Sequence, residues 1–77
     1  MYRRANPDTN LKKKRQMAGL SQKELAEMAG IPLRTIQQYE QRQKNINHAK
    51  VEYLLQLSST LCCEVECLIE RVGAYED

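Results

Sequence analysis

Residues 22–41 read QKELAEMAGIPLRTIQQYEQ and contain two short helical patterns joined by a turn at Gly30. Ser21 can cap the first helix, and Glu24 stands three positions later, which completes a capping box. Gly30 suits a left-handed helix end, and Pro32 fixes the backbone at the start of the second helix. Because the break between the two helices is so short, we expect them to cross at a steep angle.

The two helical patterns divide into apolar and polar faces. In the first helix, the apolar residues Leu25, Met28 and Ala29 are expected to face the core. In the second helix, Ile36 and Tyr39 turn toward the core, while the other side carries polar groups at positions i, i+3, i+4 and i+7. These polar groups, here called the polar stripe, are Arg34, Gln37, Gln38 and Gln41.

The polar stripe has side chains that suit the edges of base pairs. Arginine offers a bidentate fork to guanine, glutamine offers a donor and an acceptor to adenine, and an α-helix fits the major groove. The stripe therefore predicts base contacts, with Arg34 and Gln38 as first choices and Leu33, Gln37 and Gln41 as second choices, Leu33 against a thymine methyl group. On this helix alone, an ordinary solvated face explains the same residues.

The stretch and its flanks resemble the Cro/Xre class of bacterial and phage helix-turn-helix regulators. The resemblance covers LKKKRQMAGLSQKELAEMAGIPLRTIQQYEQ (11–41) and NINHAKVEYLLQLSSTLCCEVECLIE (45–70). It implies an all-α, five-helix lambda-repressor-like DNA-binding domain with the helix-turn-helix at helices 2 and 3. The family's key motif positions are occupied in register by Gln22, Ala26, Gly30, Ile36 and Tyr39.

The resemblance also implies roles for residues around the motif. It places Arg15 opposite Glu40, where an ion pair would brace the first helix against the third and orient more than stabilise, because desolvation offsets much of the Coulomb gain. It implies a homodimer on a palindromic double-stranded DNA operator, with half-sites about 34 Å apart. The expected phosphate contacts are Ser21, Gln22, Lys23, Thr35, Arg42 and Lys44.

Three positions depart from the family pattern. Relatives usually have Leu at the position of Lys14. Either the Lys14 side chain lies along the edge of the core with its charged end in solvent, or the first helix packs loosely. They usually have Gly at the position of Cys62, and a cysteine in a left-handed helix end is strained. They have a short capping residue at the position of Glu64, which caps less well.

The length and composition favour one small helical domain. A chain of 77 residues buries only about 60% of its unfolded surface, which leaves no room for a large catalytic cleft. Three Gly and two Pro are few for an architecture of strands and turns. Because the sequence has neither a Gly-rich phosphate loop nor a paired His and nucleophile, we expect neither an enzyme nor a cofactor.

The charges are divided between the two halves of the chain. Residues 1–44 hold ten Lys or Arg against four acidic residues, a net +6, whereas residues 45–77 hold two against six, a net −4. The basic half contains the helix-turn-helix pattern. This asymmetry predicts a phosphate-facing N-terminal half, with a solvated charged surface as the alternative.

The chain is expected to divide into an arm at residues 1–7, a DNA-binding domain at 8–72 and a frayed tail at 73–77. In the arm, Arg3 and Arg4 are further candidates for DNA contacts. Within the domain, Asp8, Thr9 or Asn10 can cap the first helix. Asn47 can cap a fourth helix that ends near Leu61, and a fifth would span about 64–72. Val51 and Leu55 lie off the apolar stripe of the fourth helix and are candidates for a dimer contact if they remain exposed.

The sequence predicts no signal peptide or membrane span and therefore a cytoplasmic protein with no membrane partner. Cys62, Cys63 and Cys67 are expected to be reduced. Zinc binding by Cys63, Cys67 and His48 is an alternative, but it lacks four ligands and a CxxC-type spacing.

A different function remains open. An antitoxin or anti-repressor would keep this fold but act mainly through a protein partner, such as a toxin or an effector protein. The polar stripe discriminates between the two functions, because a protein that only binds another protein has no need of Arg34 and Gln38 on that face.

Overall fold

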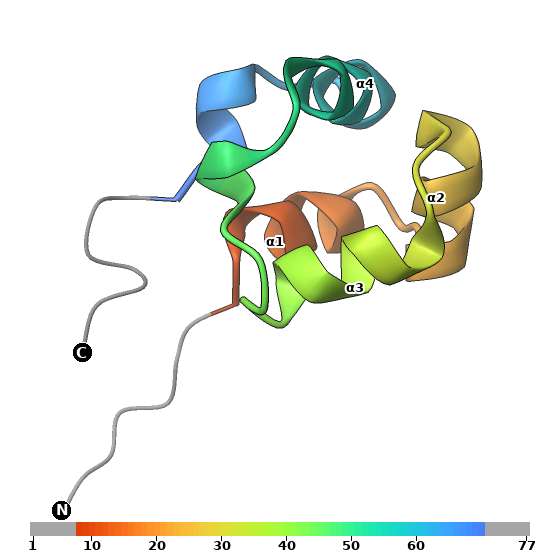
Figure 1. Ribbon diagram of the computed structural model, residues 1–77. Coiled ribbons are helices and arrows are strands. Elements are labelled where there is room, and N and C mark those ends of the chain that lie inside the picture. The colour runs from red at the N-terminus through yellow and green to blue at the C-terminus, as the bar shows by residue number, and fades with distance from the viewer. Residues whose placement is uncertain (1–7, 71–77) are drawn as a thin grey trace, which may run out of the picture.

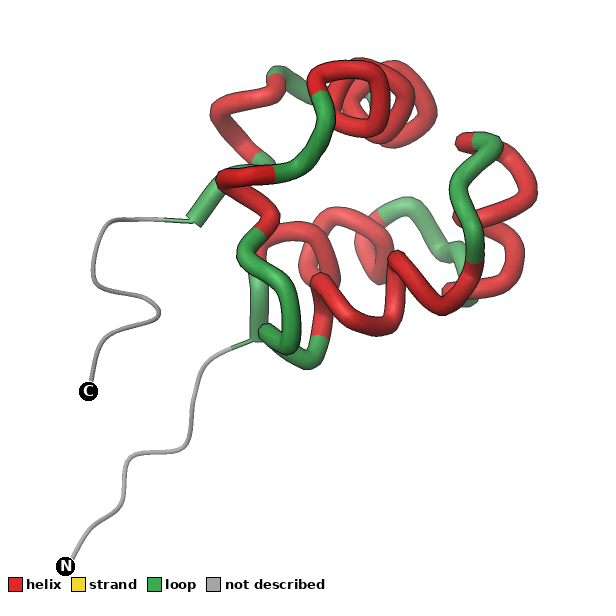
Figure 2. Tube along the Cα trace, viewed as in Figure 1, coloured by secondary structure: helices red, strands yellow, loops and turns green. Residues whose placement is uncertain are grey.

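The computed structural model describes residues 8–70, which form four α-helices and two short 3-10 helices (Figure 1). Figure 2 shows that short loops connect all of them. No strand occurs in residues 8–70, so the all-α fold class is confirmed. The predicted arm at 1–7, with Arg3 and Arg4, and the predicted tail at 73–77 lie outside the described residues. The helices are α1 (Asn10–Met17), α2 (Gln22–Ala29), α3 (Leu33–Glu40), η1 (Ile46–His48), α4 (Val51–Leu61) and η2 (Val65–Cys67).

Local capping signals set the ends of the first two helices. The Thr9 hydroxyl accepts a hydrogen bond from the Lys12 N–H at 3.1 Å and begins α1. Ser21 and Glu24 form the predicted capping box of α2, with hydrogen bonds of 3.0 and 2.8 Å between side chain and backbone. Gly30 ends α2 at φ 70°, and an added Cβ would lie 3.4 Å from the Gln56 amide oxygen of α4. The left-handed turn therefore favours glycine here, whereas an added Cβ would only make ordinary van der Waals contact with the flexible Gln56 side chain.

The core lies between the helices, and α2 packs against both α3 and α4. In α1 only Leu11 and Arg15 are buried, and Lys14 is half-buried. Within residues 8–70, the eleven buried apolar residues are Leu11, Leu25, Ala26, Ala29, Ile31, Ile36, Tyr39, Ile46, Leu57, Leu61 and Leu68.

The prediction that Met28 faces the core is wrong, because 61% of its surface is exposed. The buried stripe of α2 consists of Leu25, Ala26 and Ala29. Successive residues of an α-helix are rotated by about 100° about the helix axis. The Met28 side chain therefore points about a quarter turn away from the centre of this stripe.

The predicted fifth helix is wrong within the described residues. Only the 3-10 helix η2 forms, and Glu64 at its start provides no side-chain capping hydrogen bond. After Leu68 the backbone bonds to other parts of the chain, since the Ile69 carbonyl accepts from the Asn10 amide at 2.8 Å. Residues 69 and 70 are thus tied to the start of α1 and are not part of a helix.

Asn47 does not cap α4, contrary to the prediction. It lies inside η1, and α4 begins four residues later at Val51, without a side-chain cap. The Asn47 amide instead pairs with the backbone of Glu70. Its Nδ2 donates to the Glu70 carbonyl at 2.8 Å, and its Oδ1 accepts from the Glu70 N–H at 2.7 Å. This pair of bonds holds the end of the described chain against η1.

Candidate nucleic-acid interface

The outer face of α3 carries the polar stripe. Arg34 and Gln41 are exposed and Gln37 and Gln38 are half-buried, while Ile36 and Tyr39 on the opposite side are buried. Leu33, in the first turn, is 38% exposed. The side chains predicted to contact bases therefore share the accessible side of one helix. Gln41 also accepts a hydrogen bond from Gln43 Nε2 at 3.0 Å.

A buried ion pair holds the C-terminal end of α3. Arg15 of α1 donates from Nε to Glu40 Oε2 at 2.7 Å and from Nη2 to Glu40 Oε1 at 3.1 Å. The Arg15 side chain is 11% exposed and that of Glu40 is 3% exposed. Arg15 Nη1 also donates to the Leu20 carbonyl at 2.8 Å, and Gln22 Nε2 donates to Glu40 Oε1 at 2.9 Å. The start of α2 and the end of α3 are thus joined through one carboxylate.

This network leaves part of Gln22 available. A side-chain amide has two N–H donors, and Glu40 takes one of them. The other expected phosphate contacts near Gln22 are also accessible, since Ser21 and Lys23 are exposed and Thr35 is half-buried.

The turn after α3 is set by a left-handed residue. Arg42 has φ 59°, and the chain then folds back so that the N–H groups of Gln43 and Lys44 donate to the Gln38 carbonyl at 2.8 and 3.2 Å. The Arg42 guanidinium turns inward, where Nη2 lies 3.5 Å from Glu70 Oε1. Arg42 is therefore engaged within the protein, while Lys44 is exposed.

A surface pocket of about 420 Å³ lies beside α3, where the turn, η1 and the start of α4 meet. Lys44, His48 and Lys50 contribute basic groups to it, and none of the described residues that line it is acidic. Lys50 Nζ lies 5.3 Å from the centre of the Tyr53 ring. The remaining lining residues are Thr35, Tyr39, Asn45, Ala49 and Tyr53.

The pocket also contains a phenol that keeps its proton. Burial raises the pKa of Tyr39, and the neighbouring Tyr53 raises it further. A tyrosine phenol is neutral at physiological pH even at its ordinary pKa of about 10, so it can donate a hydrogen bond. A pocket with lysine ammonium groups, a phenol and no carboxylate favours an anionic ligand such as a phosphate.

The sequence predicted only part of this pocket. Thr35 and Lys44 were expected to contact phosphates, whereas His48 was named only as a possible zinc ligand and Lys50 was assigned no role. Both belong to a different part of the chain from the motif, and only the fold brings them beside α3. Their one signal in the sequence is that they are basic residues close after the expected loop.

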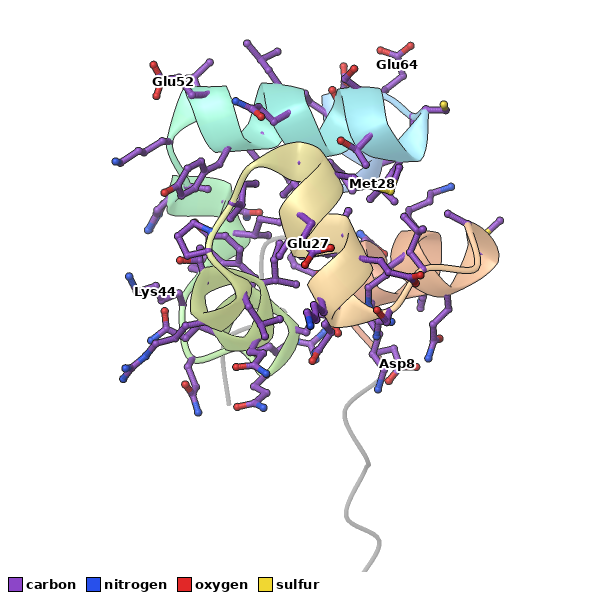
Figure 3. All side chains as sticks on the ribbon, turned by 90° about the vertical axis from the view of Figure 1, so that its right-hand side faces the viewer. Asp8, Glu27, Met28, Lys44, Glu52 and Glu64 are labelled. Carbon is purple, nitrogen blue, oxygen red and sulfur yellow. The ribbon has the colours of Figure 1, made fainter. Side chains whose placement is uncertain are left out.

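Two acidic side chains of the C-terminal half lie away from α3. Figure 3 shows Glu52 and Glu64 on the far side of α4, whereas Lys44 projects beside α3.

The described residues show neither a metal site nor a membrane span. In residues 8–70, no three His, Cys, Asp or Glu side chains are grouped so that they could hold a metal ion. No helix in the same range is long and apolar enough to cross a membrane.

The two helices α2 and α3, with the turn at Gly30 and the capping box at Ser21, form a helix-turn-helix unit. A family model described as helix-turn-helix matches residues 11–64, and the chain belongs to this family, as the Cro/Xre-type resemblance predicted. The chain is similar to the N-terminal DNA-binding domain of SinR from Bacillus subtilis, with 25% sequence identity and a TM-score of 0.71. The alignment covers 82% of this chain and 88% of that one. A comparison with curated protein sequences gives no match. Because this family consists of DNA-binding regulators, the prediction that the chain is not an enzyme is confirmed.

Proposed function

We propose that this chain binds double-stranded DNA sequence-specifically and acts as a small, repressor-like transcriptional regulator, with α3 in the major groove. The observation that carries the proposal is the position of the accessible polar stripe of α3 next to a basic pocket without acidic lining. The stripe offers hydrogen-bonding groups to base edges, and the pocket suits the adjacent phosphate backbone. The similarity to a DNA-binding domain supports the same conclusion.

In the proposed complex, Arg34 and Gln38 are the principal base contacts. Arg34 is exposed in the first turn of α3, where its guanidinium can reach a guanine edge, and Gln38 follows one turn later on the same side. Leu33, Gln37 and Gln41 surround them as secondary contacts.

The proposed phosphate contacts flank this face. Ser21, Gln22, Lys23 and Thr35 remain from the sequence prediction, and Lys44 is joined by Lys50 and His48 around the pocket. We leave Arg42 out of this set, because its guanidinium is directed to Glu70 and its side chain is only 16% exposed.

Selection of bound duplexes from a random pool tests the proposal. The chain should enrich a defined operator, and Arg34→Ala should weaken binding to it by about 1 to 3 kcal/mol and relax the preference at one base position. Lys44→Ala should weaken all duplexes similarly and reduce the salt dependence of binding by about one phosphate contact.

Two outcomes would contradict these assignments. An equal loss on operator and random DNA for Arg34→Ala would remove this residue from the base contacts. Lys13→Ala is the matched control for Lys44→Ala, since Lys13 is also exposed but lies on α1. If both lysine variants lose the same affinity, the net charge of the protein explains the effect and the pocket does not.

We further propose that the protein binds its operator as a homodimer through α4. Val51 and Leu55 are one turn apart on this helix, and 68% and 55% of their surfaces are exposed. Leu55→Glu should lower the dimer fraction measured by sedimentation and reduce the cooperativity of binding to a palindromic site. If the protein remains monomeric on DNA, the proposed dimer is wrong. If the protein instead binds a toxin or an effector stably through Val51 and Leu55, the alternative function as an antitoxin or anti-repressor is supported.

A further inference from the structure

Glu70 is a buried carboxylate that joins three segments distant in the sequence. It is 8% exposed. Its Oε2 accepts from the Asn10 backbone N–H at 2.7 Å, and its Oε1 lies 3.5 Å from Arg42 Nη2. Its own backbone N–H and carbonyl are both bonded to the Asn47 side chain. One residue thus connects the first turn of α1, the turn after α3 and η1.

The contact with Arg42 occurs where the backbone is left-handed, as it is at one other non-glycine position in residues 8–70, Cys62. Arg42 occupies the left-handed region that glycine usually fills at a helix end. This conformation turns the chain back over α3, so that Gln43 and Lys44 bond to the Gln38 carbonyl and Lys44 reaches the pocket. An arginine remains there only if the surrounding structure holds it, and Glu70 provides a charged partner for its side chain.

We propose that Glu70 is a positioning residue for DNA binding, which holds Arg42 and thereby fixes the turn that places Lys44 at the phosphate pocket. The carboxylate itself does not touch DNA in this arrangement. Its two oxygens serve different partners, and the one that faces Arg42 controls the turn. The inference rests on the proposed function, because the effect on Lys44 matters only if the pocket binds phosphate.

Glu70→Gln tests this role, because the amide oxygen can still accept from the Asn10 N–H while the negative charge beside Arg42 is lost. Binding is measured by titration of the full chain with the duplex selected from the random pool, over a range of salt concentrations. We expect an affinity about five- to tenfold lower and a salt slope smaller by about 0.9, the value of one phosphate contact. A role in folding alone would lower the active fraction and leave the slope unchanged, and an unchanged slope overturns the proposal.

Two further variants test whether Glu70 affects DNA binding through Arg42. Glu66→Gln removes the same charge from an exposed residue of η2 and should change affinity less than about twofold. Arg42→Gly removes both the guanidinium and the strain, so adding Glu70→Gln to it should lower affinity by less than about twofold. An equal loss in the two backgrounds would show that Glu70 does not act through Arg42 and would overturn the proposal.

Hydrogen exchange separates this inference from the proposed function. In the free protein, Glu70→Gln should accelerate exchange of the Gln43 and Lys44 amides at least about fivefold, because their bonds to the Gln38 carbonyl depend on the turn. Unchanged exchange overturns the positioning role even if DNA binding is weaker. If the wild-type protein binds no duplex but Glu70→Gln still accelerates this exchange, the control of the turn is supported and the proposed function is overturned.

Discussion

Replacement of Cys62 by glycine is expected to stabilise the protein. Cys62 ends α4 in the left-handed conformation, at φ 55° and ψ 48°, which costs an ordinary L-residue about 1 to 2 kcal/mol. Glycine avoids this cost but gives the unfolded chain more freedom, which offsets about 0.4 to 1 kcal/mol. The exposed cysteine side chain has little to lose, since its Sγ lies 3.9 Å from the Ser59 carbonyl. Cys62→Gly should therefore raise the free energy of unfolding by roughly 0.5 to 1 kcal/mol.

Urea denaturation in reducing buffer measures this difference. Cys62→Ala is the matched control, because it also removes the thiol but keeps the strained conformation. The glycine variant should unfold at a higher urea concentration with the same m-value, and its melting temperature should rise by roughly 2 to 8 °C. A glycine variant no more stable than the alanine variant would show that residue 62 bears no strain.

Three further predictions concern burial. Glu40→Ala leaves the buried Arg15 guanidinium without its carboxylate and should lower the free energy of unfolding by about 3 to 5 kcal/mol; a loss below about 1 kcal/mol in equilibrium denaturation would contradict a buried pair. Met28→Lys should change stability by less than about 0.5 kcal/mol, and a loss several times larger would return Met28 to the core. Burial raises the pKa of Cys63, so that less of this thiol is thiolate at pH 8. Iodoacetamide should therefore modify Cys63 more slowly than the exposed Cys62. If mass spectrometry shows the reverse order of modification, Cys63 is not buried as described.

The sequence predicts the features that depend on neighbouring residues. The capping box at Ser21 and the left-handed end at Gly30 follow from interactions within one or two helical turns. The left-handed end at Cys62 followed instead from the family resemblance. Periodicity also identifies Ile36 and Tyr39 as the buried side of α3. The helix-turn-helix unit could therefore be located from residue types and spacing alone.

Contacts between distant residues were not predictable in this way. Glu70 and Asn10 are 60 positions apart, and nothing in the local sequence distinguishes Glu70 from an exposed acid. The same contacts explain two errors, since Asn47 pairs with Glu70 instead of capping α4, and residues 69 and 70 are bonded to α1 instead of lying in a fifth helix. Met28 was misplaced for a different reason, because it falls outside the stripe of Leu25, Ala26 and Ala29 that is buried.

The orientation of α3 depends more on its polar contacts than on its apolar contacts. This eight-residue helix buries only Ile36 and Tyr39, and non-directional apolar contacts at two positions restrain rotation about the helix axis weakly. The bidentate bonds between Arg15 and Glu40 fix that rotation, because hydrogen bonds weaken steeply when their angles change. If α3 reads bases as proposed, loss of this pair should reduce discrimination between operator and random DNA even where the domain remains folded. A core substitution such as Leu57→Val, which leaves both hydrogen bonds in place, should instead lower stability and preserve that discrimination.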